Sequence, residues 1–120
     1  MSEIETRNAV IKSTALGYDG SILSAWLHLE YGGSGQGFGG YGLDAPPPPD
    51  NRQAGRQPHA VAGFFIQRVL EVVGVRKWED LTGKHVRVRC EHSKLHAIGH
   101  ILEDNWFEPG VEFGSLHGAD

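Results

Sequence analysis

The residues best suited to chemistry lie in one glycine-rich segment, residues 32–42, which reads GGSGQGFGGYG. Glycine reaches positive φ angles and lets a ligand or another chain approach the main chain closely. Consecutive N–H groups in such a loop can form a nest that holds an anion. Ser34 and Gln36 add hydrogen-bond donors, while the rings of Phe38 and Tyr41 offer faces that stack on a base. The pattern predicts a ligand or partner surface; the structural alternative is a flexible linker or a bulged strand edge.

This segment carries neither of the common nucleotide-binding fingerprints. Residues 35–40 match G-x-G-x-x-G, but a proline-rich stretch follows where the dinucleotide fold has a helix. No Lys-Ser or Lys-Thr pair follows the glycines, so the segment is not a Walker loop. The sequence therefore predicts no cofactor.

Two arginines extend the predicted ligand-binding set. Arg87 and Arg89 alternate with apolar residues, so they project from one face of a predicted strand, about 6.6 Å apart. Guanidinium groups at this spacing can hold two phosphates or carboxylates. The alternative is that they are solvent-facing charges paired with Glu30 or Glu91. The predicted ligand-binding residues are Gly33, Ser34, Gly35, Gln36, Gly37, Phe38, Tyr41, Arg87 and Arg89.

The other reactive side chains do not form a catalytic or metal centre. His96 and His100 are four residues apart, which on a strand separates them by about 13 Å, too far to share a zinc ion. Cys90, the single cysteine, is in phase with apolar residues and is expected to be a buried structural thiol. Ser34 lacks the G-x-S-x-G context of a hydrolase nucleophile. We predict no catalytic residue and no metal ligand, and we expect His28 and His100 to lie on the sheet surface.

Length and charge limit the class of protein. The 120 residues fit one domain, spanning residues 1–120. A net charge of −4 disfavours general nucleic-acid binding, which needs a basic surface. A single cysteine excludes an intramolecular disulfide framework and fits a reducing compartment. Because the sequence has no long apolar run and no signal-peptide pattern, we expect a cytoplasmic protein without membrane contact.

An antiparallel hairpin is predicted before the glycines. Residues 7–14 and 22–31 alternate apolar and polar side chains, as strands do. Asp19-Gly20 between them is a turn signal. Residues 41–43 could add a short third strand.

A helix and further strands follow a proline-rich loop at residues 45–58. Apolar residues recur every three to four positions over residues 60–74, which predicts an amphipathic helix that ends at a glycine. Strands are expected around residues 86–90 and 95–102, and a partly ordered tail from about residue 110. The order β-β-(β)-α-β-β predicts an α+β fold, with an antiparallel sheet of four to five strands packed on one helix.

Three stretches together resemble a known protein family. They are WLHLEYGGSGQGFGGYGLD (26–44), FFIQRVLEVVGVRKWEDLTGKHVRVR (64–89) and AIGHILEDNWFEP (97–109). This combination resembles a family of small, mostly uncharacterised accessory proteins of tailed phages and prophages, and the run GGSGQGFGGY is its most specific part. The resemblance covers most of the chain outside the proline loop and the two ends.

This resemblance implies a role against host defence, by analogy. Small accessory phage proteins that are neither virion parts nor nucleic-acid enzymes are often antagonists of host defence. Some sequester nucleotide second messengers, and others bind a defence protein directly. We expect this protein to bind and sequester a nucleotide-derived signalling molecule, as a homo-oligomer in the cytoplasm of the bacterial host. One alternative is a protein–protein inhibitor of a defence complex, similar to an anti-CRISPR protein and anchored by Trp26, Phe38 and Trp106. The other is a small hydrolase of such a messenger, with His28 or His100 as base.

Overall fold

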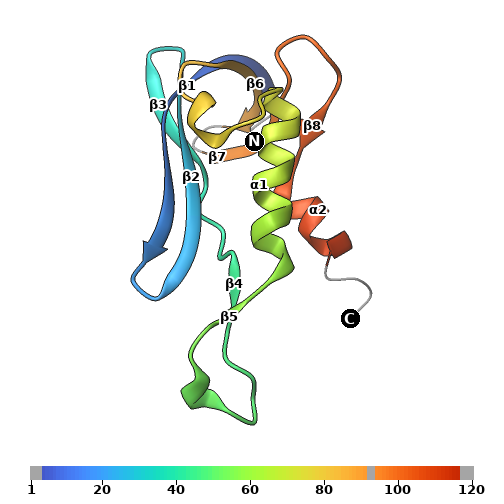
Figure 1. Cartoon of the computed structure of the whole chain (residues 1–120). Helices are drawn as coiled ribbons and strands as arrows, with labels where there is room; N and C mark the ends of the chain where they lie inside the picture. Colours follow the sequence, from blue (N-terminus) through green and yellow to red (C-terminus); the bar gives the residue numbers. More distant parts are fainter. Residues whose placement is uncertain (1–3, 92–93, 117–120) are drawn as a thin grey trace.

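Alternating apolar and polar residues shape the central strands. In β2 (Ile22–Tyr31), Leu27 and Leu29 are buried, whereas His28 and Glu30 are exposed. A sheet with one covered face requires this period of two. The structure, a computed structural model, describes residues 4–91 and 94–116 (Figure 1).

Six strands form one antiparallel sheet in the order β3-β2-β1-β6-β7-β8. Besides β2 they are β1 (Glu5–Asp19), β3 (Ser34–Gly39), β6 (His85–Glu91), β7 (Lys94–Gly99) and β8 (Trp106–Phe107). The sheet curls, so β3 at one edge approaches β7, although no strand pairing joins the two in the described part of the chain. A separate two-stranded sheet pairs β4 (Asp44–Ala45) with β5 (Gln57–Pro58).

The main helix, α1 (Ala60–Val73), packs against one face of the curled sheet (Figure 1). Its first turn is capped by His59, whose Nδ1 accepts a hydrogen bond from the N–H of Val61. It ends at Gly74, which takes the left-handed conformation with φ of 88°. The stripe that includes Phe65 and Val69 is fully buried. The predicted amphipathic helix is confirmed.

The α+β fold class is confirmed, and its strand content is corrected. The third strand covers residues 34–39 and not residues 41–43, because a two-glycine turn folds the chain back onto β2 at once. The main sheet has six strands instead of four to five, since the short β8 pairs with the end of β7. The first strand also runs well beyond residue 14, to Asp19.

The tail contains a second helix, α2 (Pro109–Leu116), in a region predicted to be only partly ordered. Phe113 on α2 packs edge-on against Tyr41, with ring centroids 5.3 Å apart, and also meets Phe64 and Phe65 of α1. These aromatic contacts join α2 to the core. Residues 117–120, the end of the predicted partly ordered tail, lie outside the described residues.

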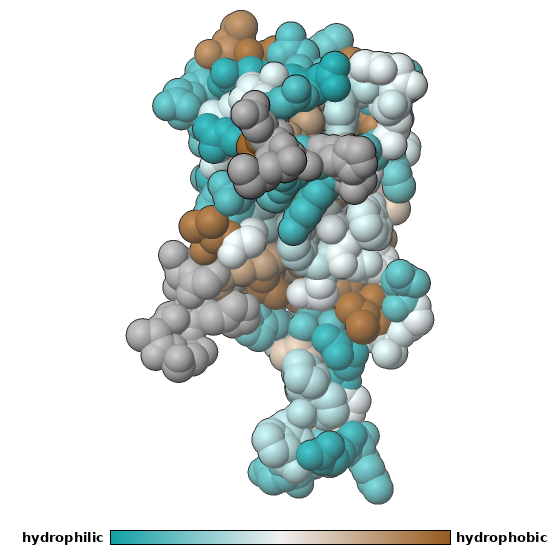
Figure 2. Space-filling model, turned by 180° about the vertical axis from the view of Figure 1, so that it is seen from behind, coloured by the Kyte–Doolittle hydropathy of each residue, from teal (hydrophilic) through white to brown (hydrophobic). Residues whose placement is uncertain are grey.

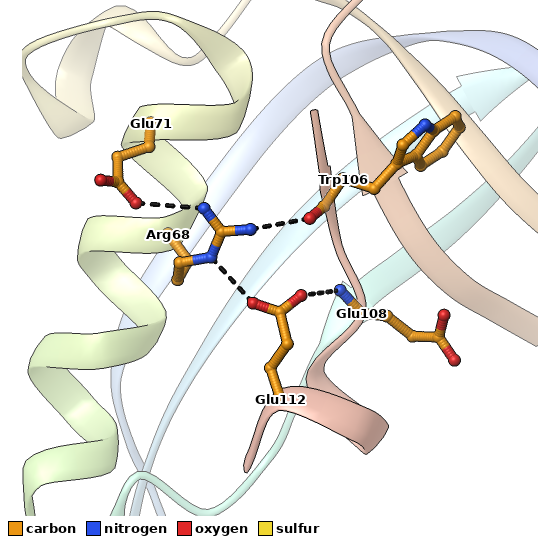
Figure 3. A network of polar contacts seen from close by, with 5 residues as sticks. All are labelled: Arg68, Glu71, Trp106, Glu108 and Glu112. Carbon is orange, nitrogen blue, oxygen red and sulfur yellow. Dashed lines mark hydrogen bonds and ion pairs between the residues drawn. The ribbon is translucent and has the colours of Figure 1, made fainter. Parts of the chain in front are cut away.

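Arg68 of α1 anchors α2 through a polar network (Figure 3). Its Nε lies 2.9 Å from Glu112 Oε1, and its Nη2 donates to the main-chain oxygen of Trp106 at 2.7 Å. The second oxygen of Glu112 accepts a hydrogen bond from the N–H of Glu108. Burial alone would lower the pKa of Arg68, but Glu112 and Glu71 outweigh it and raise the pKa, so the guanidinium stays charged.

The proline-rich loop projects from the body of the molecule at the bottom of Figure 1. It contains a short 3-10 helix, η1 (Arg52–Ala54), and its residues 49–55 are all exposed. Figure 2 shows this lobe mainly in hydrophilic colours. A second 3-10 turn, η2 (Trp78–Asp80), lies between α1 and β6. No helix within residues 4–91 and 94–116 is long and apolar enough to cross a membrane.

Candidate ligand-binding site

The glycine-rich segment forms a hairpin instead of an anion-holding nest. Gly32 and Gly33 have φ angles of 58° and 78°, the pattern of a type I′ turn, and this turn joins β2 to β3. Ser34 and Gly35 follow as exposed residues of an edge strand. The structural alternative, a strand edge, therefore describes this segment, and the nest geometry is not formed.

The group that approaches the main chain of these glycines closely is the indole of the protein's own Trp26. A methyl group on Gly37 would come within 2.7 Å of the Trp26 indole, and one on Gly40 still closer. Gly39 is equally restricted, because a Cβ there would meet the main-chain oxygen of Ala25. The glycines thus let an indole lie flat on the outer face of the sheet.

Both predicted stacking rings pack against other aromatic side chains of the protein. Phe38 is 1% exposed and lies between Phe65 and Phe107, at 6.1 Å from each ring centroid. Tyr41 is half-buried against Phe113, and burial, with a smaller contribution from Glu108, raises the pKa of its phenol. Gln36 lies on the same strand as Phe38 and is half-buried. Phe38 and Tyr41 belong to the packing of the core and its margin, whereas Gln36 lines a shallow hollow of about 250 Å³ with Gly35 and Gly37.

Arg87 and Arg89 lie on another part of the sheet, stacked against Trp106. Their guanidinium carbons are 5.0 and 3.9 Å from the indole centroid. Arg87 also donates to the main-chain oxygens of His100 and Glu103, at 2.8 and 2.6 Å. The alternative, a pairing with Glu30 or Glu91, is not formed, because those carboxylates contact Lys12 and His96 instead. The fold does not bring the two arginines and the glycine hairpin into one site.

The histidines and the cysteine have structural surroundings. His100 Nδ1 accepts two main-chain N–H groups, from Leu102 and Glu103, both at 3.0 Å, so this nitrogen is not available as a base. His28 is exposed and stacks beside Trp26. Cys90 is buried, as predicted. Across the described residues no group of three His, Cys, Asp or Glu side chains gathers that could hold a metal ion.

A cleft of about 280 Å³ lies between the end of the β1–β2 hairpin and the first turn of α1. The β1–β2 hairpin forms one wall, and the base of the proline loop and the start of α1, which follow one another in sequence, form the others. The residues that matter here are Tyr18 and Leu23 of the hairpin, Asp44 and Arg56 at the base of the proline loop, and His59 and Ala62 at the start of α1. We call this hollow the α1 cleft.

An ion pair forms one wall of the α1 cleft. Arg56 Nε lies 2.8 Å from Asp44 Oδ1, and its Nη2 donates to the Asp44 main-chain oxygen at 3.2 Å. Asp44 Oδ2 accepts a hydrogen bond from the N–H of Leu23. Burial alone would raise the pKa of Asp44, but the hydrogen bonds from Arg56 and Leu23 outweigh it and lower the pKa. Arg56 Nη1 has no hydrogen-bond partner among the described residues, so it can still donate to a ligand.

The α1 cleft combines features that suit a small aromatic ligand with an anionic group. Tyr18 presents an exposed ring, Leu23 and Ala62 are apolar, and the positive end of the α1 dipole faces the same space. This site was not predicted from the sequence, because Tyr18, Arg56 and Ala62 come together only in the tertiary structure. One signal was present: a charged residue, Asp44 or Arg56, stands near each end of the proline loop.

Comparison with known proteins finds no family model, no curated protein and no solved structure that matches this chain.

Proposed function

We propose that this protein is a non-enzymatic binding protein that sequesters a nucleotide-derived signalling molecule. The observation that carries the proposal is the α1 cleft, where an aromatic ring, apolar walls and a guanidinium face one hollow of about 280 Å³. Ligand pockets are typically concave and mainly apolar, with a few polar groups that fix orientation. The cleft volume suits one nucleoside-sized portion of a ligand.

Each part of such a ligand has a complementary group in the cleft. The Tyr18 ring stacks on the base, and Leu23 and Ala62 contact its apolar surface. Arg56 Nη1 donates to a phosphate oxygen, and the N-terminal end of α1 favours the same negative charge. Asp44 keeps the remaining arginine donors in place, which limits the number of phosphates that this cleft neutralises.

The lining groups favour binding over turnover. The Asp44 carboxylate is held by Arg56, and the His59 Nδ1 caps α1, so neither atom is placed to move a proton. Together with the resemblance to phage accessory proteins, this supports a role in the cytoplasm of the bacterial host, where the protein antagonises defence by removing a signal.

Calorimetric titration and thermal-shift measurement test the proposal, with a panel of cyclic dinucleotides and ADP-ribose derivatives. At 100-fold excess over Kd a bound ligand adds about 2.7 kcal/mol of stability. We expect Ala62→Leu to fill the cleft and weaken binding at least about 10-fold. The matched control is Gly63→Leu, an exposed α1 position with open space around it, which should bind as the wild type does.

Three results would contradict this assignment. If none of the compounds stabilises the protein, the ligand is not nucleotide-like. Loss of binding in Arg89→Gln but not in Ala62→Leu moves the site to the Trp106 face of the sheet. Ligand recovered in an altered form after denaturation of the protein supports the hydrolase alternative.

A protein–protein inhibitor is the second candidate, and one observation favours it. The Trp26 and Trp106 indoles lie on the outer face of the sheet, each over glycine, and both remain half-exposed. Phe38, the third predicted anchor, is buried and does not contribute. The test is phage growth in a host that carries the defence system. If the Ala62→Leu protein still protects the phage but the Trp26→Ala protein does not, the inhibitor function is favoured.

A further inference from the structure

The far end of the β1–β2 hairpin is only two strands wide. β6 pairs with β1 no further than Val10, and the main chain of Gly83 and Lys84 bonds to Ile11. Beyond that point, residues 14–19 of β1 pair with β2 alone among the described residues. One edge of β1 is therefore open from Ala15 to Asp19, whereas the Thr14 hydroxyl accepts a hydrogen bond from the Trp78 indole.

The hydrogen-bond pattern shows which main-chain groups face the open edge. The main-chain oxygens of Leu23 and Ala25 accept hydrogen bonds from Leu43 and Gly40, so these two residues of β2 point away from β1. Bonded and non-bonded pairs alternate along an antiparallel ladder, so their partners in β1 are in non-bonded pairs. Those partners, Tyr18 and Leu16, direct their N–H and C=O groups outward.

The side chains at this edge are apolar and exposed. Leu16 is 47% exposed, Tyr18 74% and Ile22 40%. In Figure 2 a brown apolar patch lies on the right, where the turned view places the end of the hairpin. A hollow of about 280 Å³ lies over this ribbon, lined by Ala15 and Gly17 of β1 and by their partners Trp26 and Ser24 of β2. Residues 14–19 contain none of the lysines or prolines that commonly protect sheet edges.

A two-stranded ribbon with apolar side chains in water is marginally stable by itself. We propose that a second copy of this chain pairs with it, edge to edge, through antiparallel β1 strands related by a two-fold axis at Gly17. In this register Leu16 lies opposite the partner's Tyr18, so the outward N–H and C=O groups of both copies are satisfied. Aliphatic and aromatic side chains then meet across the strands.

The sequence of the edge is complementary to itself in this register. Gly17 faces the partner's Gly17 in a non-bonded pair, the position where Cα atoms approach most closely, at about 4.5 Å. No atom lies within 4 Å of a Cβ built on Gly17, so the outer face is open there. Asp19 lies opposite the partner's Ala15, and no like charges oppose each other along the ladder.

The dimer also completes the α1 cleft. Tyr18 lines that cleft, and the partner's Leu16 packs beside it, which extends the apolar wall. The interface itself does not depend on the proposed ligand. Because the ladder is short, the buried area lies near the lower limit for specific interfaces, about 1,200 Å². We therefore expect a monomer–dimer equilibrium that depends on protein concentration.

Sedimentation of the full chain without ligand tests the interface. We expect the wild type to dimerise and Gly17→Lys to remain monomeric, because two lysines would meet at the two-fold axis. Gly63→Lys adds the same charge at an open, exposed position of α1 and should dimerise as the wild type does. A wild type that is monomeric at every concentration, or a Gly17→Lys dimer of unchanged affinity, overturns the proposal.

A cysteine cross-link tests the register independently of dimer stability. Disulfides span Cα distances of about 4.4–6.8 Å, so Gly17→Cys should cross-link two copies rapidly under mild oxidation. Cys90 is buried and does not compete. The control is Ser21→Cys in the exposed turn, which should cross-link more slowly. If Ser21→Cys is the faster variant, this register is wrong. Failure of either dimer test leaves the effect of Ala62→Leu on ligand binding unchanged, so the two proposals fail separately.

Discussion

At the scale of single residues, the glycines of residues 32–42 are needed for different physical reasons. Gly32 and Gly33 supply the positive φ angles of a tight turn. Gly37 and Gly40 have a Trp26 indole where a side chain would lie. Gly35 has no such neighbour, since the nearest atom to a Cβ there is 3.8 Å away. Composition alone does not distinguish these positions, yet substitutions at them should change stability by different amounts.

We expect Gly37→Ala to destabilise the fold by about 1–2 kcal/mol, because the added methyl displaces the Trp26 indole from the sheet. Gly35→Ala is the matched control on the same strand and face. It should change stability by no more than about 0.5 kcal/mol, or increase it slightly, since alanine suits a strand better than glycine. Urea unfolding followed by tryptophan fluorescence measures both. Equal effects of the two substitutions would contradict the role assigned to Trp26.

A second prediction at this scale concerns how the contribution of Asp44 to stability changes in acid. Its pKa is lowered in the folded protein from the usual 3.8, so the unfolded chain binds the proton more tightly. The stabilisation is therefore present above the unfolded pKa and is lost as pH falls through the lower folded pKa. We expect the stability difference between the wild type and Asp44→Asn to shrink as the pH falls from about 6 to about 3.

Urea unfolding at a series of pH values measures that difference. Arg56→Gln removes the main partner of Asp44, so in its background the pH dependence caused by Asp44→Asn should be smaller. A difference between wild type and Asp44→Asn that stays constant down to pH 3 (roughly one unit below the usual pKa) would argue against the lowered pKa.

At the scale of elements, the short helix α2 depends on contacts with the rest of the fold. An isolated helix of eight residues is not stable in water. Its position is fixed by Arg68, which reaches both Glu112 on α2 and the main chain of β8, and by the packing of Phe113 among aromatic rings. A single arginine therefore couples α1, β8 and α2.

We expect Arg68→Met to release α2 and to cost about 2 kcal/mol, since two charge-assisted hydrogen bonds are lost at a partly buried site. Hydrogen exchange of the amides in residues 111–113 should rise together with this loss. Glu71→Ala removes only the exposed i,i+3 partner of the same arginine and should cost at most about 0.5 kcal/mol. Unchanged protection of α2 in Arg68→Met would show that aromatic packing alone holds it.

At the scale of the whole molecule, the body and the proline loop are energetically separate. The buried core comes from the sheet, α1 and the segments packed on them, and residues 46–56 contribute no buried side chain. The ends of the loop meet in the β4–β5 pair and in the Asp44–Arg56 ion pair. The loop should therefore be removable without loss of the fold.

We expect a variant in which Asn-Gly replaces residues 47–55 to fold with an unfolding free energy within about 1 kcal/mol of the wild type. Shortening a closed loop lowers its closure entropy modestly, and no core residue is removed. Circular dichroism and urea unfolding check the result. A loss well above 2 kcal/mol (roughly twice the expected limit) would mean that the loop packs on the body. The Asp44–Arg56 pair is retained, so ligand binding in the α1 cleft should persist.

Local patterns in the sequence predicted the longer elements, but not the short strands β3 and β8 or the helix α2. The period-two alternation of β2, the helical period of residues 60–74 and the terminal glycine of α1 each depend on neighbouring residues in the chain. These signals predicted the α+β class and the burial of Cys90. They did not reveal that Phe38 would be buried, because which face of a short glycine-rich strand meets the core depends on its register with β2.

The tertiary structure alone decided which functional groups meet. Arg87 and Arg89 share a strand face as predicted, yet only the return of β8 places Trp106 against them. Tyr18 is distant in sequence from Arg56 and Ala62, and the curl of the sheet over α1 brings the three residues to one cleft. Spacing along a strand or helix sets the local direction of a side chain. Contacts between distant segments depend on how apolar faces cover one another, which no short pattern encodes.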